Sequence, residues 1–415
     1  MGGRWTGARR RTLSGRRDGR PARPGGVRPT SRLLLACRCL AAALSVLVLV
    51  TSGWGWHLGR LADDSLNRTD ALPSSGNDGA PGVDALGEAM NLLLVGNDSR
   101  AGADDEQLAQ DLNTGANDGM NTDTMMVVHV PADGSHASFV SLPRDSYVEI
   151  PGHGWDKLNA AYAYGYLFDA PDGATDSERE AHGAQLLIRT ISALSGVRID
   201  HYAAVDLLGF FDLSTLVGGV EVDLCEPAQD DWSGIDLPAG PQLIEGAQAL
   251  AFVRQRYGLP RGDFDRIIRQ QTFIAAMIRT VLSEDTLLDL GRQRDLVQAT
   301  ARSLTVDQDL DLFALSTQLQ SVDPAAVDFQ TVPYVGDDED EQGRYILRLQ
   351  DQDTLHRFFG QLGEDTADVP PPAAEQGADA GAPELPAEPT SPAAGQQAPV
   401  DGEDPRTADD TSCIR

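Results

Sequence analysis

Five arginines fall within the twenty residues FVRQRYGLPRGDFDRIIRQQ, 252–271, of a chain that is otherwise acidic. The 415 residues carry a formal net charge of −30 and a single lysine, Lys157. Guanidinium groups donate paired hydrogen bonds to phosphate oxygens, and a helix N-terminus adds partial positive charge. The cluster is therefore suited to phosphate and especially to pyrophosphate. Its arginines are Arg254, Arg256, Arg261, Arg266 and Arg269.

The spacing of these arginines predicts how they are presented. Arg254 and Arg256 alternate, so on an extended segment both point to one side. Asp263 is placed to N-cap the helix that begins DFDRIIRQQ. Arg266 and Arg269 are three residues apart and share a face of that helix. The arginines are thus expected to converge on one ligand.

Two acids and an amide lie among the arginines. Gln270 is four residues from Arg266 and lies beside it on the helix. The competing interpretation is that Asp263 and Asp265 pair with the arginines at the surface, where ion pairs have little energetic value. Five arginines against two acids leave an excess that such pairing does not absorb.

Charged residues also gather at the ends of three predicted strands, NLLLVG (91–96), MMVVHV (125–130) and ASFVSL (137–142). Open α/β sheets bind ligands at strand ends, so this recurrence predicts one shared site. Carboxylates there are suited to Mg²⁺, with Mn²⁺ as a second candidate, because Mg²⁺ binds a few carboxylates plus phosphate oxygens. No His or Cys spacing suggests zinc. The residues at the strand ends are Asp98, Arg100, Asp123, Arg144 and Asp145.

Strand and helix patterns alternate around these motifs, which predicts an α/β fold with a sheet covered on both faces. Weaker strand patterns lie at 202–206, 220–224 and 327–335. Helical patterns lie at 178–195, 206–218, 263–283, 286–304 and 351–362.

Composition divides the chain into five parts. Residues 1–32 are a basic tail predicted to be disordered, and residues 33–56 are apolar enough for a single transmembrane helix. Arginines before that segment place the N-terminus in the cytoplasm; a cleaved signal peptide is the competing interpretation. Residues 57–89 read as a linker, 90–363 as the folded domain, and 364–415 as a disordered acidic tail rich in Pro and Ala.

Two of the four cysteines, Cys225 and Cys413, lie in the part predicted to be outside the cell membrane, where disulfides persist. They form either one bridge or two unrelated thiols. The acidic charge of the same part, without an extended basic face, argues against a nucleic-acid partner.

Several motifs, in this order, resemble the LytR-CpsA-Psr family of bacterial cell-envelope proteins, in its actinobacterial form. The resemblance covers about residues 90–284. The family's common R-S-D-T motif reads Asn121-Thr122-Asp123-Thr124 here, without its arginine, and residues 101–120 are an insertion that is either a lid or an embellishment. The motifs are MNLLLVGNDSR, NTDTMMVVHV, SLPRDSYVEIPG, DKLNAAYAYG, HYAAVDLLGFFDL, LVGGVEVDL and ALAFVRQRYGLPRGDFDRIIRQQ.

The resemblance implies a membrane-anchored, extracytoplasmic α-β-α sandwich with a central mixed sheet. It implies a phosphotransferase that moves a glycan from a polyprenyl-pyrophosphate donor to peptidoglycan, in a hydrophobic pocket that holds the lipid. Asp98 and Asp123 would be the metal carboxylates. The actinobacterial ending resembles TSCIR and favours a Cys225–Cys413 bridge. The phosphates would be surrounded by Arg100, Arg144, Arg254, Arg256, Arg266, Arg269 and Gln270.

Catalysis is expected to rest on Arg144, Arg254 and Arg256, which stabilise developing charge on phosphate. The base for the acceptor hydroxyl is left open between Asp98, Asp145 and a phosphate of the substrate. Two other functions stay open: a polyprenyl-phosphate-binding regulator without turnover, and a lipid pyrophosphatase with water as acceptor.

Overall fold

A computed structural model describes residues 53, 59–60, 65–80, 89–99, 122–281, 283, 290–311, 315, 322–362 and 406–415. The chain divides into two compact units, Met1–Trp56 and His57–Arg415, and only Gly53 of the first is described. The predicted basic tail (1–32), nearly all of the predicted anchor (33–56), Arg100 and the 101–120 insertion therefore lie outside the described residues. No helix within the described ranges is both long and apolar enough to cross a membrane.

The second unit is built on an eight-stranded sheet with the order β1-β12-β7-β2-β3-β4-β13-β16. The sheet is mixed: β2 pairs with β7 in parallel and with β3 antiparallel. The predicted central mixed sheet is thus confirmed. Its strands are β1 (Asn67–Thr69), β2 (Met90–Asn97), β3 (Thr122–Val130), β4 (Ala137–Ser141), β7 (His201–Val205), β12 (Leu304–Asp307), β13 (Val327–Thr331) and β16 (Arg406–Thr407).

Four small antiparallel pairs lie outside this sheet. They are β5 (Tyr147–Ile150) with β6 (Gly154–Lys157), β8 (Val220–Leu224) with β11 (Gly240–Ile244), β9 (Ala228–Asp230) with β10 (Ile235–Leu237), and β14 (Tyr334–Glu339) with β15 (Tyr345–Leu349).

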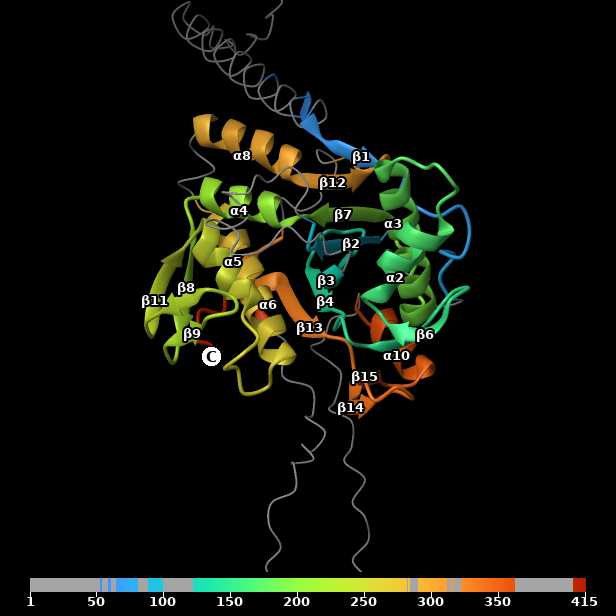
Figure 1. The fold of residues 1–415 in the computed structure, drawn as a ribbon. Helices are drawn as coiled ribbons and strands as arrows, with labels where there is room; N and C mark the ends of the chain where they lie inside the picture. Colours follow the sequence, from blue (N-terminus) through green and yellow to red (C-terminus); the bar gives the residue numbers. More distant parts are fainter. Residues whose placement is uncertain are drawn as a thin grey trace, which may run out of the picture. The chain divides into compact units, whose positions relative to one another are not determined.

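Helices cover the sheet on both sides (Figure 1). On one side lie α2 (Ala160–Tyr164), the π-helical turn η2 (Gly165–Asp169), α3 (Asp176–Ser195) and α10 (Gln352–Gly360). The other side carries α4 (Leu207–Leu216), α5 (Gly246–Arg254), α6 (Asp263–Val281) and α8 (Leu290–Ser303). A short 3₁₀ turn, η3 (Pro324–Ala326), precedes β13.

Strand alternation assigns neighbouring residues of β2 to opposite faces of the sheet. Leu93 and Val95 belong to the core formed with α3 and α10, whereas Leu92 and Leu94 pack in the cluster that includes Ile274 of α6. The near-continuous apolar run NLLLV is therefore explained by burial on both faces, as expected for an inner strand of a covered sheet.

The prediction of a linker over residues 57–89 is wrong for residues 65–80. Asn67–Thr69 form β1, which pairs in parallel with β12 at one edge of the sheet. The side chain of Asn77 donates to the Ile199 carbonyl and accepts from the Ile199 amide, at 2.7 and 2.8 Å. Polar composition was misleading here because these side chains satisfy backbone groups of the domain rather than water.

The predicted strand at 327–335 is two strands. β13 ends at Thr331 and β14 begins at Tyr334. Pro333 lies between them and has no N–H to donate to a ladder, so the chain leaves the central sheet there and pairs with β15 instead.

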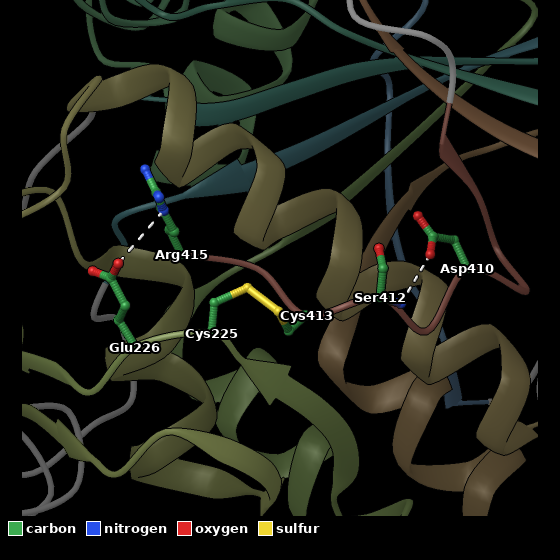
Figure 2. The surroundings of a disulfide bond; sticks show 6 residues. All are labelled: Cys225, Glu226, Asp410, Ser412, Cys413 and Arg415. Carbon is green, nitrogen blue, oxygen red and sulfur yellow. Dashed lines mark hydrogen bonds and ion pairs between the residues drawn. A yellow bond between two sulfur atoms is a disulfide. The ribbon is translucent and has the colours of Figure 1, made fainter.

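The last ten residues are ordered, although the sequence predicted disorder throughout 364–415. β16 adds to the sheet edge at β13. Cys225 and Cys413 form a disulfide whose surroundings Figure 2 shows. The Cys225 amide donates to the Ile414 carbonyl at 2.8 Å, and the Ile414 amide donates to the Asp223 carbonyl at 2.9 Å. Covalent and backbone bonds thus order a terminus whose composition alone favours disorder.

Candidate functional site

A cavity of about 720 Å³ lies between one face of the sheet and the helices that cover it. Much of its lining is apolar, because both the strands and the helices turn aliphatic and aromatic side chains toward it. These side chains include Leu94, Val128, Phe139, Leu207, Phe210, Leu213, Phe273, Ile274, Met277, Ile278 and Val281.

Charged and amide side chains line another part of the same cavity. Six of the predicted site residues meet there, from strand ends β2 and β3, from the end of α5 and the segment after it, and from the first turns of α6. They are Asp98, Asp123, Arg254, Arg256, Arg266 and Gln270. One cavity therefore joins an apolar compartment to a cluster of arginines and carboxylates.

A bulge at the end of β2 positions Asp98. The register between β2 and β3 shifts between Gly96 and Asn97, and bulges of this kind redirect side chains next to functional sites. At Gly96 a β-carbon would lie 3.1 Å from the Thr124 β-carbon, so a larger residue crowds the neighbouring strand. The Asn97 side chain accepts from the Ser99 amide at 3.1 Å and closes the turn around Asp98.

Arg144 lies among three carboxylates. Its Nη1 donates to Asp123 Oδ1 at 2.7 Å, and its Nε lies 3.6 Å from Asp145 Oδ2 and 4.0 Å from Asp263 Oδ1. Burial alone would lower the pKa of Arg144, but the charges of Asp123 and Asp263 outweigh it and raise that pKa. Arg144 is therefore a fixed cation that also orients Asp123.

Arg266 lies close to this group and is more deeply buried. Its Nη2 lies 2.5 Å from Asp263 Oδ1. Burial lowers the pKa of Arg266, Asp263 opposes that shift, and the nearby charges of Arg144 and Arg256 add to it. Crowded, desolvated cations of this kind are stabilised by an anion that binds between them.

Two buried guanidinium nitrogens strengthen this interpretation. Within the described parts of the chain, Arg144 Nε and Arg266 Nε have no hydrogen-bond partner. Buried polar groups without partners are uncommon in native proteins. Arg266 lines the cavity, whereas Arg144 does not, so Arg266 is the one of the two that is placed to meet a ligand.

Asp145, like Arg144, is not among the residues that line the cavity. It is 4% exposed, and its Oδ1 accepts from Nζ of Lys157, the only lysine of the chain, at 2.7 Å. The structure therefore does not bring Asp145 to a position where it contacts a bound ligand. Asp145 Oδ2 lies 3.6 Å from Arg144 Nε and stabilises the charge of that arginine.

Arg269 and Arg261 are also directed away from the cavity. Arg269 Nη1 donates to Gln255 Oε1 at 2.5 Å and Nε donates to the Arg415 carbonyl at 2.9 Å. Burial lowers the pKa of Arg269 to about 10. Arg261 Nε donates to Asp265 at 2.8 Å. The competing interpretation is thus correct in that Arg261 and Arg266 pair with Asp265 and Asp263, but these acids are largely buried rather than at the surface.

Two local predictions about the arginine stretch are corrected. Arg254 is the last residue of α5 rather than part of an extended segment with Arg256, because the apolar residues of GAQALAFVR follow a helical spacing that buries Ala249 and Phe252. Asp263 is the first residue of α6 and not its N-cap. Both Arg254 and Arg256 nevertheless line the cavity.

Sequence reasoning missed several residues of the charged part of the cavity. Asp206 N-caps α4 by accepting from the Gly209 amide at 2.7 Å, and burial raises the pKa of its carboxyl group. The Asp before LLGFF was the available signal. Asp230, Trp232, Ser233 and Tyr257 also line the cavity, and no local pattern links 230–233 to the arginine stretch.

Asp98 and Asp123 are the carboxylates that would hold a divalent cation here. Both line the cavity, although Asp123 also accepts from Arg144, and no cluster of three or more His, Cys, Asp or Glu side chains forms within the described ranges. Two carboxylates suffice for Mg²⁺ where substrate phosphates and water complete its coordination.

Comparison with known proteins gives a consistent family assignment. The family model that matches is that of the LytR_cpsA_psr family, over residues 66–361. The cell wall biosynthesis protein LcpA of Corynebacterium glutamicum is 38% identical over 364 residues, which cover 82% of this chain and 67% of LcpA. The polyisoprenyl-teichoic acid–peptidoglycan teichoic acid transferase TagU of Enterococcus faecalis is 31% identical over 225 residues, covering 54% of this chain and 63% of TagU.

Among solved structures, a LytR-Csp2A-Psr enzyme from Actinomyces oris has the same fold. It superposes with a TM-score of 0.50 at 20% sequence identity and covers 71% of this chain and 96% of that one.

Proposed function

Because the chain belongs to the LytR-CpsA-Psr family, we propose that it attaches a polyprenyl-pyrophosphate-linked glycopolymer to peptidoglycan during cell-wall assembly. The relatives LcpA and TagU are named for cell wall biosynthesis and for transfer of teichoic acid to peptidoglycan. The observation that carries the proposal is a cavity that combines an apolar lining with a cluster of arginines.

The cavity matches the two halves of such a donor. A polyprenyl chain is apolar, so its burial against Phe139, Phe273 and Ile278 contributes favourable free energy to binding. The pyrophosphate is anionic and is complementary to Arg254, Arg256 and Arg266. The phosphates of the lipid would lie at Arg254, Arg256 and Arg266. Within the described residues, no other segment brings several arginines to this cavity.

The reaction is a displacement at phosphorus. The acceptor hydroxyl oxygen attacks the phosphorus that carries the sugar, the bond from that phosphorus to the bridging oxygen breaks, and polyprenyl phosphate leaves with the electron pair. The arginines stabilise the negative charge as it shifts toward the leaving phosphate. Positioning and electrostatics supply most of the catalysis in such transfers.

The hydroxyl proton needs an acceptor. Of the two carboxylates considered from sequence, Asp98 lines the cavity, whereas Asp145 is held by Lys157 and Arg144. We therefore assign the base to a phosphate oxygen of the donor when Asp98 holds a metal ion, and to Asp98 when it does not, and we assign Asp145 to the support of Arg144.

Mg²⁺ is part of the proposal. Asp98 and Asp123 would hold the ion, which would add positive charge beside the phosphates when bound. Chelation with EDTA is expected to abolish transfer, and added Mg²⁺ to restore it, with Mn²⁺ as a substitute. Transfer that persists after thorough chelation would remove the metal from the proposal.

Location is also proposed. An apolar anchor at residues 33–56, with the N-terminus in the cytoplasm, would keep the domain beside its lipid donor outside the membrane. The disulfide between Cys225 and Cys413 supports an oxidising compartment.

The test is a transfer assay with the full-length protein in detergent, a polyprenyl-pyrophosphate-linked oligosaccharide as donor and peptidoglycan fragments as acceptor. Arg256→Ala is expected to lower the rate at least about 100-fold, as for loss of a donor to transition-state charge. Arg348→Ala is the matched control, because Arg348 is a half-exposed arginine that pairs with Asp338 outside the cavity.

An Arg256→Ala rate close to that of the wild type would contradict the proposal. Release of polyprenyl phosphate without any transfer, in the presence of acceptor, would identify a lipid pyrophosphatase instead. Tight binding of the donor with neither product would identify a lipid-binding regulator.

A further inference from the structure

Two exposed aromatic side chains lie at the charged part of the cavity. Trp232 is 77% exposed and Tyr257 is 59% exposed. Their ring centroids are 6.1 Å apart, and both residues line the cavity together with Arg254 and Arg256. Two exposed aromatic rings beside arginines in one cavity are suited to pack against a ligand bound there.

The turn that carries Trp232 is held in a defined shape. It joins β9 to β10, and both oxygens of the Asp230 carboxylate accept backbone N–H groups from it, Oδ1 from Trp232 at 3.0 Å and Oδ2 from Ser233 at 3.2 Å. The Gly234 amide donates to the Asp230 carbonyl at 2.9 Å, and Gly234 has a φ of 78° that favours glycine. The indole is therefore presented on a fixed turn.

Tyr257 is fixed from the other side. The Gln255 side chain donates to the Tyr257 carbonyl at 3.0 Å, and the same side chain accepts from Arg269. Arg269 is thus tied to the shape of the loop that carries Tyr257, which gives a role to an arginine that does not line the cavity. The backbone that carries each ring is thus held before any ligand binds, which lowers the entropic cost of binding.

The chemistry of the donor indicates what meets these rings, if the proposed function is right. The polyprenyl chain leaves the pyrophosphate on one side and the first sugar leaves it on the other. Because the apolar compartment takes the lipid, the sugar must lie beyond the arginines, and Tyr257 directly follows Arg256 in the chain. A sugar ring has an apolar C–H face that packs on an aromatic ring and hydroxyl groups at its rim.

We propose that Trp232 and Tyr257 form a subsite for the first sugar of the lipid-linked donor. Asp230 lies beside it in the cavity lining, and its carboxylate oxygens, which accept one backbone amide each, keep lone pairs for a hydroxyl group at the rim of the sugar. The inference rests on the proposed function, because it takes the pyrophosphate to lie at Arg254 and Arg256.

A membrane surface fits the aromatic pair less well. Asp230, Asp231 and Asp236 lie on the same hairpin as Trp232, and carboxylates are repelled by the anionic lipid headgroups that attract basic segments. A neutral sugar meets no such repulsion.

The test compares two lipids on the full-length protein in detergent micelles: a polyprenyl pyrophosphate, and the same lipid with one N-acetylhexosamine on its terminal phosphate. Calorimetric titration gives the Kd of each. Trp232→Ala is expected to weaken binding of the sugar-bearing lipid about fivefold, the size of one aromatic contact, and to leave binding of the bare lipid unchanged. Trp232→Phe should retain most of the affinity, because it keeps a ring.

Trp155→Ala is the matched control. Trp155 is also 59% exposed and also lies beside a tyrosine, Tyr147, with centroids 5.4 Å apart, but it does not line the cavity. A loss for Trp232→Ala that is equal for both lipids, or absent for both, would overturn the sugar subsite and leave the proposed function standing. Failure of the wild type to bind either lipid would overturn the proposed function and the subsite with it.

Discussion

The two faces of the central sheet are lined by the same strands but are covered in different ways. Leu93 of β2 is fully buried against α3 and α10. Leu94, the next residue, lines the cavity under α4 and α6. The residues packed against one face form a continuous buried cluster, whereas the other face borders a cavity of about 720 Å³. The filled face supplies stability, and the open face supplies the site.

The filled face is closed by small residues at the helix contacts. A β-carbon on Gly183 of α3 would lie 2.9 Å from the Tyr162 carbonyl, and one on Gly165 would lie 2.4 Å from the His182 carbonyl. The backbones of α2, η2 and α3 therefore approach closely. On the open face, α6 instead turns Phe273, Ile274 and Met277 toward the cavity, so side chains line a space and do not fill it.

The strongest test of this difference is a pair of adjacent substitutions. Leu93→Ala is expected to lower the free energy of unfolding by about 3 kcal/mol, because it leaves a void in a filled core. Leu94→Ala should cost about 1 kcal/mol, because that side chain already borders open space. Denaturant unfolding of both variants measures the difference, and equal losses would show that the two faces are packed alike.

Protonation of His129 offers a second test of how tightly the filled face is packed. His129 shares the filled face with Leu93 by strand alternation, and its Nδ1 lies 2.8 Å from Asn91 Oδ1. The pKa of His129 is lowered from 6.5 to about 4, chiefly by burial and also by the charge of His136, while Asp328 opposes the shift. The imidazole is therefore neutral in the folded protein at pH 5 but protonated in the unfolded chain.

The sign of the pH effect follows from this difference. Between pH 6.5 and 4 the unfolded state binds more protons, so stability falls as the pH falls. From pH 7 to pH 5 the loss due to His129 should be about 2 kcal/mol. His129→Gln removes this contribution, so its unfolding free energy should vary less over the same range. An identical pH dependence in both proteins would show that the folded protein tolerates the charged imidazole.

Sequence patterns located the parts of this fold that depend on local information. The runs NLLLVG and MMVVHV correspond to β2 and β3, and the spacing in 263–283 corresponds to α6. The charged strand ends and the arginine stretch likewise predicted six residues that the structure places in the lining of one cavity. Periodicity and strand termini carry this information because they require no knowledge of distant partners.

What sequence reasoning missed depends on contacts between distant segments. Arg269 was expected at phosphate but bonds to the Arg415 carbonyl, 146 residues away. Asp145 was a candidate base but is occupied by Lys157. Residues 65–80 were predicted to be part of a linker, but the Asn77 side chain donates to the Ile199 carbonyl of the folded domain. In each case the side-chain type was judged correctly as polar, and its partner was set by the tertiary fold.

The smallest predicted effect on stability comes from a substitution that adds a larger side chain to the cavity on the open face. Met277 lines the cavity, so Met277→Trp should change the free energy of unfolding by no more than about 1 kcal/mol, because the added ring has space. Ala184 of α3 lies in the filled core, and Ala184→Leu should cost about 1–3 kcal/mol through overpacking. Filling the cavity should also weaken binding of polyprenyl pyrophosphate about tenfold, which corresponds to 1.4 kcal/mol. If Met277→Trp binds that lipid as tightly as the wild type, the open face is not where the lipid chain lies, and the link between the cavity and the proposed donor is lost.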